Sequence, residues 1–196
     1  MIEFLQENVD YIIAVFTTLF AIAGMQFKDM RVIIVSQIAA NGLLAAQAIL
    51  GGTASASGII FLGIVQTVIS FIFTAKKKDF PMWLTLIFVV GFTVITVIYF
   101  TNAFDILTCV AAWFFAIAIV QKNSAVCRLY SAINVALWLI YDIFVMPSGM
   151  INHTIILCFI IVAIIRLDRA EWRGMGLIKT AARDLADGIK NTFKKA

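Results

Sequence analysis

The chain has 196 residues, of which 63% are hydrophobic and only 13% are charged, with a formal net charge of +4 at pH 7. A soluble domain carries about 25% charged residues, so this chain has too few polar side chains to cover a globule in water. The mean hydropathy of +1.02 and this composition exclude an ordinary soluble domain and predict an integral membrane protein covered largely by lipid.

Seven apolar stretches are long enough to cross the hydrocarbon core of a bilayer, which takes about 17–25 residues of α-helix. The stretches are uniformly apolar and do not alternate with period two, so they predict helices and not the strands of a barrel. Short breaks that contain glycine, proline, serine or charged residues separate them. In chain order the predicted spans are 9–26, 32–50, 58–74, 81–99, 104–120, 126–145 and 151–166.

The distribution of charge predicts the orientation of these spans. With seven spans, all 15 lysines and arginines fall on one side of the membrane. The positive-inside rule places that side in the cytoplasm, which puts residues 1–8 outside and the C-terminus inside. The chain starts with acidic residues where a cleavable signal peptide needs basic ones, so the first span is expected to be retained. The acids assigned to the outer side are Glu3, Glu7, Asp10, Asp105 and Asp142.

A decapeptide occurs twice in the chain. LFAIAGMQFK at 19–28 returns 95 residues later as FFAIAIVQKN at 114–123, with five of ten positions identical. This offset predicts two parallel three-helix repeats, 9–74 and 104–166. A unit of three helices ends on the side of the membrane opposite to where it began, so the extra span 81–99 is needed to give the second copy the same orientation as the first. Accidental similarity between apolar helices is the alternative. The offset also aligns Asp10 with Asp105, Gln26 with Gln121, Ser36 with Ser131 and Gln47 with Asp142.

The three-one-three arrangement resembles the SWEET sugar-permease fold, which PnuC-type vitamin transporters and PQ-loop proteins share. The absence of a PQ dipeptide argues against the PQ-loop branch. RLYSAINVALWLIYDIFVMPSGMI at 128–151 and IIVAIIRLDR at 160–169 resemble the signature of the YgjV-type bacterial inner-membrane family, and the similarity extends over residues 10–170. The resemblance implies an inner-membrane location and the three-one-three fold, and it implies no particular substrate.

Polar side chains inside the spans are the candidate site, because such residues are costly in lipid and usually face the bundle interior. On the sixth span, polar and aromatic residues recur along one stripe of the helix, and Asn134 is expected to meet Asn41 near the bilayer centre. Amides and aromatic faces suit a small polar or cationic solute. Interhelical hydrogen bonds and interfacial aromatic residues are the alternatives. The predicted substrate-binding residues are Asn41, Gln66, Trp113, Ser131, Asn134, Trp138 and Tyr141.

Two carboxylates near the outer surface, Asp105 and Asp142, are expected to be solvated groups of an outer rim, with buried proton carriers as the alternative. His153 is expected to be a surface residue. No nucleophile–base pair, phosphate loop or cluster of metal ligands is evident in the sequence, so neither an enzyme nor a cofactor or metal is expected. The three cysteines have no metal-ligand spacing and are expected to be small core residues. They are Cys109, Cys127 and Cys158.

The C-terminal tail, residues 167–196, is basic and partly amphipathic. It predicts a cytoplasmic helix on the anionic lipid surface, with a disordered tail as the alternative, and its four interspersed acids argue against nucleic-acid binding. The sequence favours a carrier of an unidentified small solute in the bacterial inner membrane. A non-transporting sensor or a partner subunit of a larger membrane complex is the alternative. The oligomeric state is open, a homo-oligomer included.

Overall fold

The computed structural model describes residues 9–50, 54–100, 102–145, 149–172 and 183. Seven α-helices and no strand occur within these residues, as the uniformly apolar runs predict. The predicted N-terminal segment 1–8 and nearly all of the predicted tail lie outside the described residues. The helices are α2 (Val9–Met25), α3 (Met30–Leu50), α4 (Ala54–Ala75), α5 (Met82–Ile98), α6 (Asp105–Ala118), α7 (Ser124–Phe144) and α8 (Met150–Trp172).

Three of these helices are long and apolar enough to cross a membrane by length and composition, and the other four contain shorter apolar segments. The bounds differ from the predicted spans mainly at two helices. α4 begins at Ala54, because alanine favours helix whereas the two serines of this first turn interrupt the apolar run. α8 continues past residue 166 to Trp172, and Asp168 in this extension forms an ion pair with α7. The qualifying segments are Gly58–Ala75, Ser124–Phe144 and Met150–Arg169.

Local hydrogen bonds mark where several helices begin and end. The side chain of Asn123 accepts a hydrogen bond from the backbone N–H of Ala125 at 2.8 Å and caps the start of α7. At the end of α4, the N–H of Lys78 donates to the carbonyl of Phe73 at 2.9 Å, and Lys77 has a φ of 53°. This left-handed termination is usually formed by glycine, so a lysine at this position is unusual.

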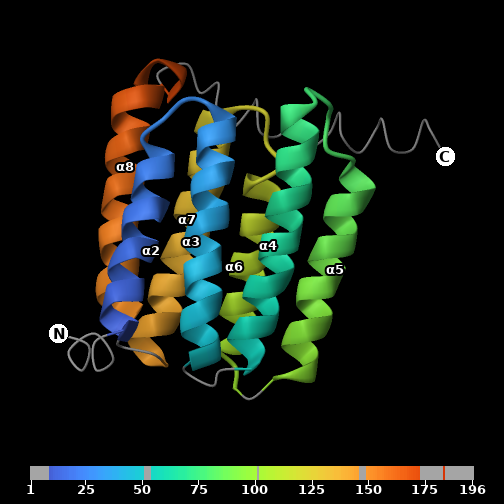
Figure 1. Cartoon of the computed structure of the whole chain (residues 1–196), viewed down its shortest axis with the longest axis vertical. Coiled ribbons are helices and arrows are strands. Elements are labelled where there is room, and N and C mark those ends of the chain that lie inside the picture. The colour runs from blue at the N-terminus through green and yellow to red at the C-terminus, as the bar shows by residue number, and fades with distance from the viewer. Residues whose placement is uncertain (1–8, 51–53, 101, 146–148, 173–182, 184–196) are drawn as a thin grey trace.

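The helices stand side by side as an upright bundle (Figure 1). The connections after α2, α4 and α6 lie at one end, together with the C-terminal end of α8. We name this the basic end, because it carries Lys28, the lysines at 76–78 and Lys122. The opposite end, at the start of α6 and the end of α7, is named the acidic end after Asp105 and Asp142.

The middle helix of each predicted triplet packs against both of its neighbours: α3 against α2 and α4, and α7 against α6 and α8. α8 also packs against α2, and α5 packs against α4 and α6 at one edge of the bundle (Figure 1). Two cysteines, Cys109 and Cys127, are buried as expected, whereas Cys158 is exposed on α8. The largest buried apolar cluster joins five helices and contains Ala21, Met25, Ile33, Ala40, Ala118, Cys127, Ile156, Ile160 and Ile164.

Close contact between α2 and α3 depends on a small residue at position 24. A methyl group added at Gly24 would lie 2.6 Å from the Cβ of Ser36, whereas a methyl group at Gly42 would meet nothing within 4 Å. Helices in lipid associate largely through such close packing. We therefore expect Gly24→Ala to lower the free energy of unfolding in detergent by about 1–3 kcal/mol. The matched variant Gly42→Ala should be neutral or slightly stabilising, and equal losses in both variants would contradict this account of the α2–α3 contact.

Candidate functional site

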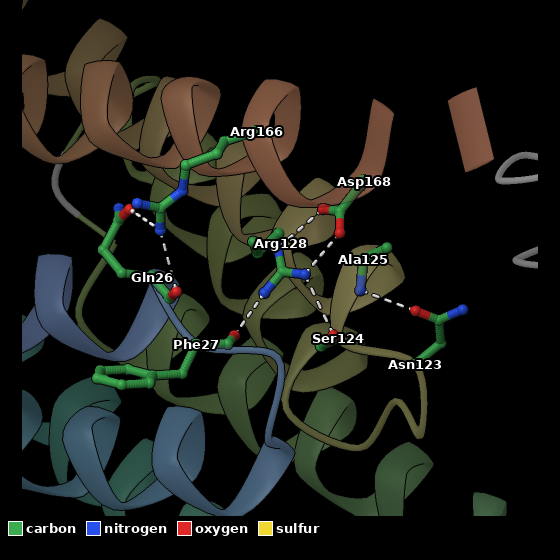
Figure 2. A network of polar contacts seen from close by, with 8 residues as sticks. All are labelled: Gln26, Phe27, Asn123, Ser124, Ala125, Arg128, Arg166 and Asp168. Atoms are coloured by element: carbon green, nitrogen blue, oxygen red, sulfur yellow. Dashed lines mark hydrogen bonds and ion pairs between the residues drawn. The ribbon is translucent and has the colours of Figure 1, made fainter. Parts of the chain in front are cut away.

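A buried arginine joins three elements at the basic end (Figure 2). Arg128, in the first turns of α7, is fully buried. Its Nε donates to Asp168 Oδ2 at 2.8 Å and its Nη2 to Oδ1 at 2.6 Å, so the pair is bidentate. Its Nη1 donates to the carbonyl of Phe27 at 2.7 Å and its Nη2 to Ser124 Oγ at 3.2 Å. We name these four residues the basic-end lock, because they tie α7 to α8 and to the connection between α2 and α3.

A second set of contacts joins α8 to α2 beside the lock (Figure 2). Nη2 of Arg166 donates to the side-chain oxygen of Gln26 at 3.0 Å and to its backbone oxygen at 3.2 Å. The Gln26 amide in turn donates to the carbonyl of Phe159 at 3.2 Å. These groups are more exposed than Arg128, so they contribute less to stability than the buried pair.

A carboxylate–imidazole contact lies at the acidic end, where Nδ1 of the partly buried His153 is 2.5 Å from Oδ2 of the buried Asp142. The imidazole also stacks on the ring of Trp138, with centroids 6.0 Å apart and planes 16° apart. Trp138 meets Tyr141 edge-on at 5.7 Å, and Tyr141 lies near Asp105 and Asp142. We name these five residues the acidic-end cluster.

The carboxylate of Asp142 is completely enclosed. Its side chain is 1% exposed, and Oδ1 has no hydrogen-bond partner among the described residues. Gly149 lies close beside this carboxylate: a Cβ added at Gly149 would be only 2.5 Å from Oδ2. Asp105 is buried as well. Both carboxylates therefore differ from the solvated rim groups that the sequence predicts, because they sit between helix ends whose packing is not visible in a hydropathy profile.

Three of the predicted binding residues form hydrogen bonds between helices. The amide of Asn134 on α7 donates to the carbonyl of Ala111 on α6 at 2.9 Å. Gln66 on α4 donates to the carbonyl of Ala116 at 2.9 Å, and its Oε1 has no partner among the described residues. The indole of Trp113 donates to Thr93 on α5 at 3.1 Å. Hydrogen bonds at Ala111, Trp113 and Ala116 thus tie α6 to α7, α5 and α4.

The expected pair of Asn41 and Asn134 is not joined by a hydrogen bond in the described part of the chain. Asn41 is half-buried on α3, which packs mainly against α2 and α4, and the hydrogen bond of Asn134 leads to α6. Ser131 lies half-buried beside Cys127. The side chains of Asp10 and Gln47, which the 95-residue offset aligns with Asp105 and Asp142, lie outside the described residues.

The structure therefore brings together only part of the predicted set: Trp138 and Tyr141 join the two carboxylates at the acidic end. Sequence reasoning missed His153, which is partnered and not a lone surface residue. It also missed the pair of Arg128 and Asp168. A signal existed for that pair, since an arginine just inside a predicted span and an acid among basic residues both need a partner when buried.

Seven apolar helices in the described part of the chain, three of them long enough to cross a membrane, fit a multi-pass membrane protein. The chain matches the Imp-YgjV family, described as bacterial inner membrane protein, over residues 9–171. It belongs to that family and is located in the bacterial inner membrane, in agreement with the resemblance seen in the sequence. No curated protein and no solved structure matches the chain.

Proposed function

We propose that the chain is a carrier that moves a small polar or cationic solute across the inner membrane by alternating access between two three-helix repeats. The observation that carries this proposal is the presence of a buried ion pair, Arg128–Asp168, and a partly buried contact between Asp142 and His153 on the same helix pair, α7 and α8. Arg128 and Asp142 are 14 positions apart, which is about 21 Å along a helix. Charged side chains at membrane depth are costly and usually mark a path for a polar solute.

The chemistry of the acidic-end cluster supports a cationic solute. Two buried carboxylates, Asp105 and Asp142, lie at this end. The imidazole of His153 contacts Oδ2 of Asp142, and Oδ1 of Asp142 lacks a partner among the described residues. The ring of Trp138 presents a face that could stack on a cation. The His153 imidazole occupies the place between this ring and the carboxylate, and a solute would compete with it for Asp142.

The basic-end lock would close the path on the cytoplasmic side. Opening there would separate Arg128 from Asp168 and from the carbonyl of Phe27, and so free the α2–α3 connection from α7 and α8. Opening at the other side would separate Asp142 from His153. The packing of α3 and α7 between their neighbours supports the two-repeat layout, and the charge distribution supports a cytoplasmic C-terminus.

A thermal-shift screen tests this proposal. Purified protein in a neutral detergent would be heated with millimolar imidazole, guanidinium, choline or a small primary amine. A bound cation at ten times its Kd should stabilise the fold by about 1.4 kcal/mol. Asp142→Asn should abolish that stabilisation, whereas Asp79→Asn at an exposed carboxylate should keep it. Stabilisation that persists in Asp142→Asn would contradict the assignment of this cluster, and a stabilising cation would next be tested for uptake into proteoliposomes.

A sensor or partner subunit is the second candidate function. The hydrogen bonds of Asn134 and Gln66 favour it, because they join α6 to α7 and α4 and leave these amides engaged within the bundle. Asn134→Ala tests whether this amide takes part in binding or only holds α7 to α6. A carrier that uses the amide would keep its fold and lose cation-dependent stabilisation, whereas a purely structural amide would lose stability without any change in ligand response.

A further inference from the structure

A basic hollow of about 210 Å³ opens at the basic end, and its lining includes no residue of the basic-end lock. It lies between the end of α4, the start of α3 and the connection from α6 to α7. We infer that it binds a phosphate group, presented by an anionic phospholipid of the surrounding leaflet. The hollow is lined by Met30, Ser70, Thr74, Lys77, Lys78, Asp79, Phe80, Val120, Gln121 and Lys122.

The charges of the hollow favour an anion. Lys122 forms an exposed ion pair with Asp79 at 2.7 Å, so this lysine is largely compensated. Lys77 and Lys78 form no ion pair with another described residue, and both line the hollow. Two uncompensated ammonium groups beside the hydroxyl of Thr74 provide the donors that a phosphate oxygen accepts.

The backbone at Lys77 points to a role for its side chain. Its φ of 53° is a conformation that glycine adopts without strain and that a lysine does not. The position ends α4 as a C-terminal cap, where glycine is the usual residue. A strained residue of this kind is a reason to look for a function, and the placement of Lys77 in the wall of the hollow provides one.

The surroundings identify a lipid as the source of the phosphate. Met30, Phe80 and Val120 add an apolar side to the hollow, which suits the glycerol and upper acyl chain of a phospholipid. Trp83, at the start of α5 directly after this connection, is 54% exposed, and exposed tryptophans mark the membrane–water interface. Basic pockets between helices at the cytoplasmic face are sites where lipid head groups bind.

The test compares two double variants with equal charge loss. Lys77→Gly/Lys78→Gln removes the free charges of the hollow and gives the strained position a residue that suits it, so the fold should be kept. Lys28→Gln/Lys76→Gln removes two lysines of the basic end that do not line the hollow. Thermal unfolding in a neutral detergent would be followed with added phosphatidylglycerol, phosphatidylcholine or inorganic phosphate.

We expect phosphatidylglycerol to raise the unfolding midpoint of the wild type and of Lys28→Gln/Lys76→Gln. Its apparent Kd should be at least about tenfold weaker in Lys77→Gly/Lys78→Gln. An equal effect of inorganic phosphate, lost in the same variant, would support the phosphate site and identify a soluble phosphate as its occupant. Four results would overturn the inference. Phosphatidylglycerol could stabilise both double variants equally, or lose its effect equally in both. Phosphatidylcholine could stabilise the protein as much as phosphatidylglycerol does, or phosphatidylglycerol could fail to stabilise the wild type. None of these outcomes depends on transport.

Discussion

Replacing Arg128 by methionine is expected to lower the free energy of unfolding by about 3–5 kcal/mol. The substitution leaves the carboxylate of Asp168, which is 2% exposed, without the bidentate partner that compensates its charge. It also removes the donor to the carbonyl of Phe27. Reversible unfolding of the purified protein in mixed micelles measures the loss, and Arg128→Lys should recover only part of it, because an ammonium group cannot reproduce the bidentate geometry.

Two controls separate an uncompensated charge from a simple loss of packing. In Arg128→Met/Asp168→Leu no buried charge remains at the basic-end lock, so most of the loss should be regained. Lys122→Met breaks an ion pair whose side chains are about three-quarters exposed, and it should cost at most about 1 kcal/mol. If the double variant is as unstable as Arg128→Met, the charge of Asp168 is not the cause of the instability.

Gly149→Ala is expected to destabilise the fold by about 1–3 kcal/mol and to disturb the acidic-end cluster. The added methyl group would lie 2.5 Å from Oδ2 of Asp142 and 2.8 Å from its Cγ. The carboxylate cannot move away freely, since His153 holds Oδ2 and the side chain is enclosed. The measurement is the unfolding free energy in detergent. The signal of the single histidine of the chain in an NMR spectrum would report whether the imidazole has shifted.

A double-mutant cycle makes this prediction specific to the contact. In an Asp142→Ala background the space beside Gly149 is vacant, so Gly149→Ala should cost less there than in the wild type. An equal cost in both backgrounds would show that the glycine is required for the backbone of the turn before α8 and not for space beside Asp142.

If the carrier proposal holds, Arg128→Met and Gly149→Ala act on opposite ends of one path. Loss of the basic-end lock would favour opening on the cytoplasmic side, and disruption of the acidic-end cluster would favour opening on the other. Single cysteines placed near each end would then change in accessibility in opposite directions. This coupling would distinguish a carrier from a static membrane subunit, in which each substitution changes accessibility only near itself.

The sequence by itself determined that the chain is a membrane protein built of apolar helices, and it located seven of them to within a few residues at most ends. These properties are local, because the transfer of each apolar residue into lipid depends on that residue and on the length of its run. The sequence also predicted the polar stripe of α7, since Trp138 and Tyr141 lie on one face at helical spacing. The repeat layout and the orientation remain predictions.

Only the tertiary structure decided which polar groups meet. Arg128 pairs with Asp168 across 40 positions, and Asp142 pairs with His153 although both were expected at a solvated surface. Asn134 bonds to Ala111 and not to Asn41. Polar side chains in a span usually pair with other polar groups, but the partner is set by which helices are neighbours and by their rotation and depth. These depend on packing over the whole bundle, which no single stretch of sequence specifies.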